Sequence, residues 1–166
     1  MSIQWLNKNN INEIKSIAFS EFNKDLKSHD SDHLYEKVLG GDKFGNIDLN
    51  YGLITSYNKP IGIIGYYLPE VDKNAAWLGW FAIKPEFRRK GYGEKAVIHL
   101  IGYLKKRYPF LEVLRAYTDI TNIGALKFYK SMGFQQDGAP FKNAVIIDYN
   151  LKKGNILNRW NKEPIW

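Results

Sequence analysis

The chain has no cysteine among its 166 residues. This absence excludes disulfide bonds, metal sites built on thiolates and a cysteine nucleophile. Its apolar runs are far shorter than the roughly 20 residues that a membrane-spanning helix needs. The first residues, Met1 to Trp5, have neither the basic start nor the apolar stretch of a secretory signal. We therefore expect a cytoplasmic protein without a membrane partner.

Long basic stretches are also missing, although the net charge is +7. An excess of positive charge suits nucleic acid, a phosphorylated cofactor, or solubility alone. The basic residues form only short clusters, at 88–90, 105–107 and 152–153. Proteins that bind nucleic acid usually have a longer basic stripe or a recognisable reading helix. We therefore predict no nucleic-acid partner.

Candidate metal ligands are scarce as well. His29 and His33 are one helical turn apart, which is a spacing that can bind a metal. The segment has no convincing third ligand, and capping of a helix by Ser31 or Asp32 explains it more simply. His99 lies off the apolar stripe of its helix and should be exposed. We predict no metal site.

The length fits one domain, 1–166, with core motifs in 75–151 and a tail at 152–166. Periodicity and turn residues predict strands at 3–6, 51–57, 61–68, 75–83, 111–118 and 144–151, and helices at 11–22, 31–39, 94–107 and 122–131. Asn10 is expected to cap the first helix. Gly79, inside an apolar strand, indicates a bulge or a close backbone approach. This order of elements predicts an α/β or α+β domain with a mixed sheet.

The residues Arg88-Arg89-Lys90-Gly91-Tyr92-Gly93 join a buried strand to a helix. A helix start has unpaired N–H groups and a positive dipole, and glycines let an anion approach closely. The three cations add positive potential, so the loop suits a diphosphate, although a tight turn with solvated cations remains the plain alternative. No Gly-Lys-Ser/Thr ends the loop, which excludes a Walker loop. No acidic residue closes a second strand, as a Rossmann loop would require.

Residues 77–134 resemble the GNAT superfamily of acetyltransferases. The family's loop pattern, Arg/Gln-x-x-Gly-x-Gly/Ala, is matched by Arg88, Gly91 and Gly93. Its second pattern, Asn-x-x-Ala-x-x-Phe/Leu-Tyr-x-x-x-Gly-Phe, is matched by Asn122, Ala125, Phe128, Tyr129, Gly133 and Phe134. The resemblance implies a mixed, mostly antiparallel central sheet flanked by helices. It also implies a cofactor cleft between two splayed strands, 75–83 and 111–118.

The resemblance implies acetyl-CoA as the cosubstrate, with no metal. The backbone of 81–83 would pair with the pantetheine arm, the amides of 89–94 would hold the pyrophosphate, and Asn122 would hydrogen-bond the arm. The cofactor-binding residues implied in this way are Phe81, Ala82, Ile83, Arg88, Arg89, Lys90, Gly91, Tyr92, Gly93, Glu94, Asn122 and Phe128.

Tyr129 would lie near the sulfur and act as the general acid. A leaving thiolate has a parent pKa near ~8.5 and a tyrosine near ~10, so a protonated tyrosine can supply the proton at neutral pH. Without the motif, Tyr129 would be interpreted as a core aromatic on its helix. The tetrahedral oxyanion needs fixed donors, and backbone N–H groups between Gly79 and Phe81 are candidates.

The general base is not assigned by the sequence. An attacking amine must be neutral, so a base or a water chain should help it lose a proton. Some family members have a glutamate where this chain has Trp77, and others where it has Tyr117. We expect Tyr117 to orient water or substrate. The remaining carboxylates are interpreted as solvated loop or strand-edge groups: Glu70, Asp72, Glu112 and Asp119.

The sequence therefore predicts an acetyl-CoA-dependent N-acetyltransferase that acts on a primary amine of a small molecule or peptide, as a monomer or homodimer. A non-catalytic acetyl-CoA-binding regulator of the same fold is the alternative, because the expected glutamates are missing. A nucleic-acid-binding module is the third and least favoured hypothesis.

Overall fold

The computed structural model describes residues 1–22, 46–154 and 159–165. The helix predicted at 31–39 and the pair His29 and His33 lie outside these ranges. The described helices are α1 (Ile11–Phe22), α3 (Tyr92–Arg107), α4 (Ile123–Ser131) and the short 3₁₀ helix η1 (Pro85–Phe87). The strands are β1 (Ser2–Trp5), β2 (Asn46–Ser56), β3 (Lys59–Pro69), β4 (Ala75–Leu78), β5 (Ala82–Ile83), β6 (Val113–Asp119), β7 (Gln135–Gln136) and β8 (Ala144–Asn150).

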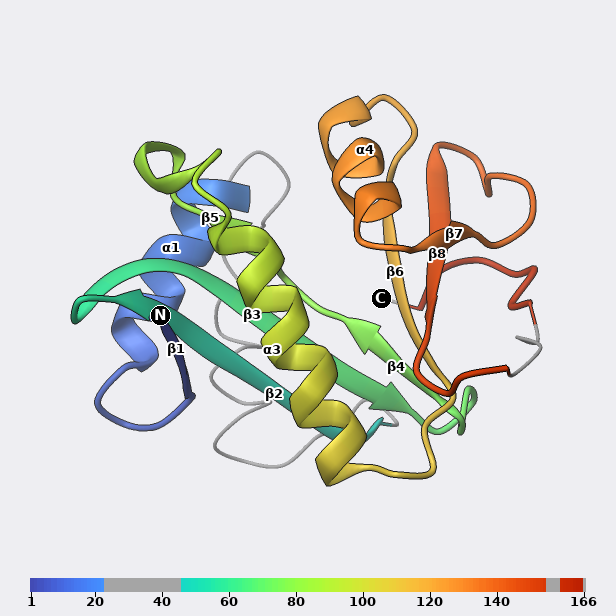
Figure 1. Ribbon diagram of the computed structural model, residues 1–166, viewed down its shortest axis with the longest axis horizontal. Helices are drawn as coiled ribbons and strands as arrows, with labels where there is room; N and C mark the ends of the chain where they lie inside the picture. Colours follow the sequence, from blue (N-terminus) through green and yellow to red (C-terminus); the bar gives the residue numbers. More distant parts are fainter. Residues whose placement is uncertain (23–45, 155–158, 166) are drawn as a thin grey trace.

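These strands form one sheet in the order β1-β2-β3-β4-β6-β8-β7, with β5 also pairing with β3 (Figure 1). The pairing of β4 with β6 is parallel, and the other pairings are antiparallel. The predicted mixed, mostly antiparallel sheet is therefore confirmed.

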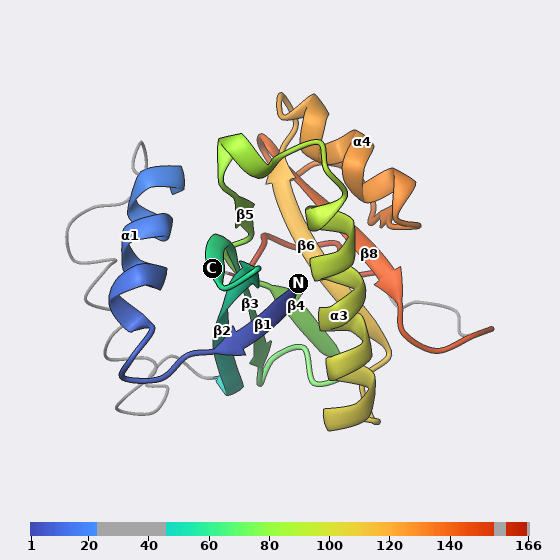
Figure 2. The ribbon, with the colours of Figure 1, turned by 60° about the vertical axis from the view of Figure 1, so that its left-hand side comes forward.

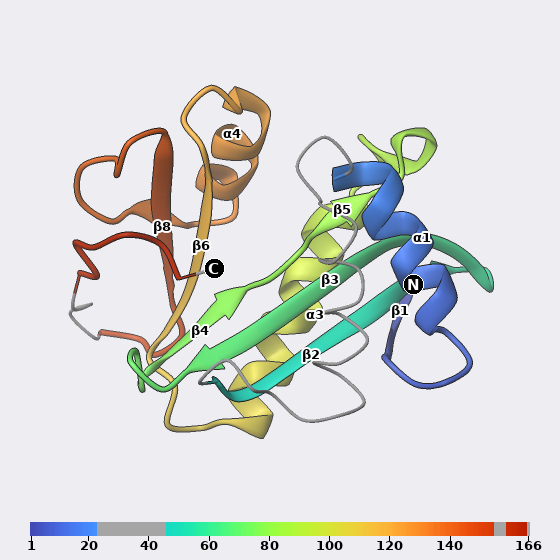
Figure 3. The ribbon, with the colours of Figure 1, turned by 180° about the vertical axis from the view of Figure 1, so that it is seen from behind.

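Helices cover both faces of the sheet. Helix α3 packs on one face through a fully buried stripe that includes Val97, Leu100 and Leu104, and α4 adds Tyr129 to the same core. Helix α1 packs on the other face through Ile14 and Ile17. Figure 2 shows α1 and α3 on opposite sides of the strands, and Figure 3 shows the face that α1 covers. The two faces therefore belong to different cores.

The single strand predicted at 75–83 is wrong, because the chain leaves the ladder after Leu78 and rejoins it at Ala82. The break begins at Gly79, whose N–H donates to the Gly65 carbonyl at 2.8 Å. A β-carbon at Gly79 would lie 3.2 Å from the Gly65 backbone and from the Tyr51 hydroxyl. The predicted close backbone approach at Gly79 is therefore confirmed.

Three details at the ends of elements differ from the prediction. The Asn10 side chain turns back instead of capping α1: it accepts from the Asn7 N–H at 2.8 Å and donates to the Trp5 carbonyl at 3.1 Å. Residues 46–50, which precede the strand predicted at 51–57, belong to β2. Helix α3 begins two residues earlier than predicted. The prediction that His99 is exposed is confirmed.

No helix in the described ranges is long and apolar enough to cross a membrane.

Candidate active site at the splayed strands

The strands β4 and β6 separate in the middle of the sheet. Their parallel pairing runs from Ala75 with Val113 to Trp77 with Arg115. Beyond that point β6 continues to Asp119 in register with β8, while β5 pairs with β3. Figure 1 shows β5 and β6 diverging toward the end of the molecule that carries the start of α3 and α4. The predicted splay between these strands is confirmed.

The edge of β5 that faces away from β3 is open for pairing in the part of the chain that the structure describes. The Lys84 N–H donates to the Ile61 carbonyl at 2.8 Å, and Ala82 pairs with Ile63. Strand alternation therefore directs the Ile83 amide toward the splay. The Ile83 carbonyl accepts from Arg88 Nε at 2.7 Å, so pairing with a ligand is left to its N–H.

The break between β4 and β5 reduces the number of backbone N–H groups that could serve as the predicted oxyanion donors. Because Gly79 donates to Gly65, its N–H cannot serve, and this part of the prediction is wrong. The amides of Trp80 and Phe81 have no backbone acceptor among the described residues. They are the donors that remain beside the splay.

The loop before α3 presents backbone amides at one point. Helix η1 precedes this loop. Within the loop, Arg89 (φ 60°) and Gly91 (φ 76°) adopt left-handed conformations, and Gly91 is the N-cap of α3. The first bond of the helix runs from Lys95 N–H to the Gly91 carbonyl, 3.2 Å. The amides of 92–94 therefore have no partner within the helix and carry its positive dipole end. Unpaired amides at a helix start can bind an anion, and anion binding by this loop stays a prediction.

The cation Arg88 is bound by the protein itself. Besides its bond to the Ile83 carbonyl, its guanidinium pairs with Glu21 of α1, whose side chain is 10% exposed. The side chain of Arg88 therefore fixes the loop to β5 and α1. A direct contact with phosphate would have to compete with these bonds.

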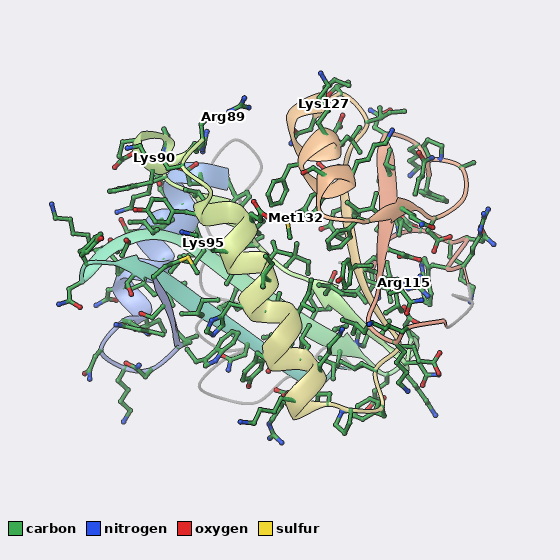
Figure 4. All side chains as sticks on the ribbon, in the orientation of Figure 1. Arg89, Lys90, Lys95, Arg115, Lys127 and Met132 are labelled. Carbon is green, nitrogen blue, oxygen red and sulfur yellow. The ribbon has the colours of Figure 1, made fainter. Side chains whose placement is uncertain are left out.

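The next two cations differ from each other. Lys90 Nζ donates to the Glu86 carbonyl at 2.9 Å and lies over the Phe87 ring. Arg89 is exposed and has no partner in the described part of the chain. Figure 4 shows Arg89 at the same end of the molecule as Lys127 of α4. Of the three adjacent cations, Arg89 is thus the one whose charge is available.

The side chain of Tyr92 points away from the splay. Its hydroxyl accepts from Ser56 Oγ at 3.3 Å, and its ring packs edge-on against Phe87. With Lys95 and Ser56 it helps to line a separate cavity of about 450 Å³. The contribution of Tyr92 to an anion site therefore comes from its backbone.

Gly93 faces two aromatic rings from the two sides of the splay. A β-carbon at Gly93 would lie 3.5 Å from Phe81 and from Phe128, which is ordinary van der Waals contact. The centroids of the Phe81 and Phe128 rings are 5.9 Å apart. The predicted residues Gly93, Phe81 and Phe128 therefore meet between the start of α3, the β4–β5 break and α4.

Asn122 caps α4 through its side-chain oxygen, which accepts from the Ala125 N–H at 3.1 Å. Asn122 is an exposed residue, and its amide nitrogen keeps donors for a ligand. Asp119 accepts from the N–H and the hydroxyl of Thr121, and these bonds hold the pKa of Asp119 below its usual value. Asp119 is therefore a weak base that serves the turn before α4.

Tyr129 is 8% exposed and packs edge-on against Phe128 and Phe134, with ring centroids 5.2 Å apart in both pairs. No described residue hydrogen-bonds to its hydroxyl. Burial raises the pKa of Tyr129 above its usual value, so the phenol stays protonated at neutral pH. Tyr129 is thus a core aromatic whose O–H remains available to an outside acceptor.

Tyr117 of β6 and Trp77 of β4 lie side by side where the two strands separate. Burial raises the pKa of Tyr117 to about 12, and its ring lies 6.5 Å from that of Trp77. Trp77 is fully buried and donates through Nε1 to Asp72 at 2.9 Å. Asp72 also accepts from Arg115 Nε at 2.8 Å, so it is a structural carboxylate with little freedom to act as a base.

A buried charge cluster beside the splay was missed by the sequence reasoning. Arg115 of β6 is 3% exposed and, besides Asp72, contacts Asp137 at 3.0 Å and Asp148 at 2.5 Å. Burial raises the pKa of Asp148 to about 7, Arg115 lowers it, and Asp137 raises it. The available signal was the arginine inside the apolar run Val113-Leu114-Arg115-Ala116, because a buried charge requires partners.

Two oxygens in this cluster, Asp137 Oδ1 and Asp148 Oδ1, are buried without a partner within the described ranges. One cation faces three carboxylates here, and the raised pKa of Asp148, about 7, reduces the excess negative charge by favouring its protonated form. Among the described side chains, no group of three or more potential ligands is arranged to hold a metal ion.

Comparison with known proteins places these features in a family. Residues 9–134 match the model of the Acetyltransferase (GNAT) family. An uncharacterized N-acetyltransferase of Methanocaldococcus jannaschii is 28% identical over 82 residues, which is 47% of this chain and 35% of that protein. The match therefore covers about a third of the relative's length.

Solved structures share the fold at low identity. An aminoglycoside 6'-acetyltransferase type Ii superposes with a TM-score of 0.73 at 14% identity, covering 93% of this chain and 100% of that one. A spermidine N-acetyltransferase from Vibrio cholerae, in complex with CoA and spermine, has a TM-score of 0.71 at 15% identity, covering 90% and 95%. Since the family model spans most of the chain and the splayed sheet agrees with it, the chain belongs to the GNAT family of acetyltransferases.

Proposed function

We propose that the protein is an acetyl-CoA-dependent N-acetyltransferase whose acceptor is a primary amine of a small molecule or peptide. The observation that supports this most directly is the presence of three features on the elements that border the splay. These are the open edge of β5, the unpaired amides at the start of α3, and the available hydroxyl of Tyr129. We further propose that 1–166 acts as one cytoplasmic domain.

The residues around the splay fit acetyl-CoA. Backbone amides of 89–94 would hold the pyrophosphate, and the exposed guanidinium of Arg89 would add charge. The Ile83 N–H and the Asn122 side-chain amide would hydrogen-bond the pantetheine arm, while Phe81 and Phe128 would contact it. The bound cosubstrate supplies an acetyl thioester. Its phosphates need this cradle, because burying them without partners is costly.

Acetyl transfer then requires one bond to form and one to break. The amine nitrogen attacks the thioester carbonyl, the carbon–sulfur bond breaks, and Tyr129 donates its phenol proton to the leaving thiolate. The amides of Trp80 and Phe81 would stabilise the oxyanion. The amine loses its extra proton to water that Tyr117 orients, and solvent returns a proton to Tyr129.

An amine acceptor is supported by the neighbours in structure. One is named as an aminoglycoside 6'-acetyltransferase and one holds CoA and spermine, so this fold accommodates amines. A regulator that binds acetyl-CoA without turnover is the second candidate. Trp77 and Tyr117 favour it, because they replace the glutamates that would activate an amine.

Calorimetry with CoA, combined with thiol release from acetyl-CoA over a panel of primary amines, separates the candidates. The wild type should bind CoA and release thiol with at least one amine. Tyr129→Phe should bind CoA equally well while kcat falls by about 10²- to 10⁴-fold, the usual contribution of a general acid. Tyr57→Phe is the control, since Tyr57 is 94% exposed.

The outcomes are distinct. CoA binding without turnover on any amine would favour the regulator. Absence of CoA binding would contradict both candidates, and equal kcat values for wild type and Tyr129→Phe would remove Tyr129 as the acid.

A further inference from the structure

The C-terminal segment, residues 159–165, packs on the sheet face opposite α3 and α4. Neighbouring residues of β3 mark the two faces. The Tyr66 hydroxyl lies 3.0 Å from that of Tyr108, which follows α3, whereas the Tyr67 hydroxyl donates to the Ile165 carbonyl at 2.5 Å. Pro164 is buried. The segment, which the sequence pattern left uninterpreted, therefore covers the face that does not carry the phosphate loop.

The same segment stands where β4 and β6 separate. The Trp160 ring meets Trp77 edge-on, with centroids 5.7 Å apart, and lies 5.9 Å from the Arg115 guanidinium. Trp77 and Arg115 are the last residue pair joining β4 to β6. Figure 4 shows Arg115 among the strands below α4. Trp160 therefore marks the closed end of the splay.

Tyr117 extends this contact along the open edge of β6. It follows Arg115 by two residues, so both side chains lie on the same face. Tyr117 and Trp77 belong to one apolar cluster, to which Trp160 and Ile165 add their side chains. The C-terminal segment is thus continuous with the residue that we expect to orient water or substrate.

Buried contacts fix the segment in this place. The Trp160 N–H donates to Asp137 Oδ2 at 2.5 Å, and the same carboxylate contacts Arg115. Trp160 Nε1 donates to the Glu163 carbonyl at 2.9 Å, which closes a turn. A β-carbon at Gly138 would lie 2.6 Å from Asn161 Oδ1, so the Asn161 side chain lies close to the Gly138 backbone. The segment is held by specific bonds as well as by apolar contact.

The donor and the acceptor would reach the splay from opposite faces of the sheet. Helices α3 and α4 and the phosphate loop occupy one face, from which the donor would enter. An acceptor must then reach the thioester from the other face. Helix α1 flanks that face through the stacking of Phe22 on Trp80, and the C-terminal segment flanks it on the side of β6.

We infer that the C-terminal segment forms one wall of the acceptor site and that Trp160 limits the size of the amine that fits. Asp137 and Arg115 are positioning residues that hold Trp160 in place. The wall acts by its bulk, because the indole already lies within 5.9 Å of Arg115 and 5.1 Å of Lys162. The favoured acceptor is therefore a primary amine with a compact substituent. This inference rests on the proposed function.

The first test measures acetyl transfer to primary amines of graded size. Trp160→Ala should raise the ratio of kcat/KM for bulky amines to that for compact amines by about tenfold, the effect of a few missing methylene contacts. Trp160→Phe should restore most of the preference, and the KM for acetyl-CoA should stay the same in both. Arg159→Ala is the control, because Arg159 is an exposed neighbour in the same segment. An unchanged ratio in a folded Trp160→Ala protein would overturn the inference.

A second readout does not depend on turnover. The protein has five tryptophans, so labelling with 5-fluorotryptophan gives five ¹⁹F signals, and Trp160→Phe identifies one of them. Compact amines added to the CoA-bound protein should shift the Trp160 signal. Bound amines that shift other tryptophans and leave Trp160 unaffected would contradict the wall. Loss of turnover with a shifted Trp160 signal would count against the proposed reaction and leave the wall supported.

Discussion

Replacing Asp148 by asparagine should change how the stability of the protein depends on pH. Asp148 is 4% exposed, and its pKa is raised from 3.8 to about 7, mainly by burial. Asparagine keeps the shape of a protonated aspartate and keeps an oxygen that can accept from Arg115. Its amide can also donate to the unpaired Asp137 Oδ1. The substitution therefore imitates the neutral form at every pH.

The direction of the effect follows from proton binding. Below pH 3.8 both the folded and the unfolded chain hold the proton, so Asp148 favours neither. Between 3.8 and about 7 only the folded chain holds it, and wild-type stability falls by about 1.4 kcal/mol per pH unit. Over roughly three units the loss is about 4 kcal/mol. The free energies of unfolding of wild type and Asp148→Asn should diverge by that amount, with the variant more stable at pH 8.

Urea denaturation at half-unit steps from pH 4.5 to 8 measures this difference. Glu163→Gln, which neutralises an exposed carboxylate of the C-terminal segment, serves as the matched control and should run parallel to wild type. The difference between Asp148→Asn and wild type should level off above about pH 7. Two parallel curves would refute the reasoning, because they would mean that Asp148 is ionised throughout and fully compensated by Arg115.

Three further substitutions have defined outcomes. Gly91→Ala should lower the free energy of unfolding by about 1–2 kcal/mol in urea, because φ is 76° and the new β-carbon meets no atom of the described residues within 4 Å, leaving only backbone strain; no loss would argue against the left-handed loop. Arg89→Ala should weaken CoA binding several-fold by calorimetry at low salt and less at high salt, since exposed charges are screened; a salt-independent effect would contradict a phosphate contact. Arg115→Met should destabilise the fold by about 3–5 kcal/mol by leaving the aspartates without a cation; a stable variant would show that the carboxylates hold protons instead.

The sequence was most informative where local chemistry repeats a family pattern. Arg88, Gly91 and Gly93 predicted an anion site, and the structure has unpaired amides there because Gly91 adopts a left-handed conformation and starts α3. Asn122 predicted the start of a helix and caps it. These features depend on residues close together in the chain, so short motifs determine them.

The sequence was less informative where contacts join distant segments. The bond from Gly79 to Gly65 removed an expected oxyanion donor, and only the pairing of β3 with β4 places these residues together. Arg115 could be flagged as a charge in an apolar strand, but its partners Asp137 and Asp148 come from later elements. The roles of Phe81, Asn122 and Tyr129 toward a ligand stay predictions that the experiments above test.

Burying Arg115 and its aspartates at the closed end of the splay costs free energy, and there is a physical reason for a charge cluster at this place. Apolar residues in place of Arg115 and its aspartate partners together would suffice to fill the core, and buried ion pairs seldom add net stability. A cluster of directional bonds does what apolar contact does not: it fixes the backbone of Trp160 through Asp137 and the orientation of the Trp77 indole through Asp72. Both indoles adjoin the point where β4 and β6 separate. The cluster therefore has two effects with one structural origin. It lowers the free energy of unfolding above pH 7, and it holds Trp160, whose side chain restricts the acceptor. Asp137→Ala should alter both together.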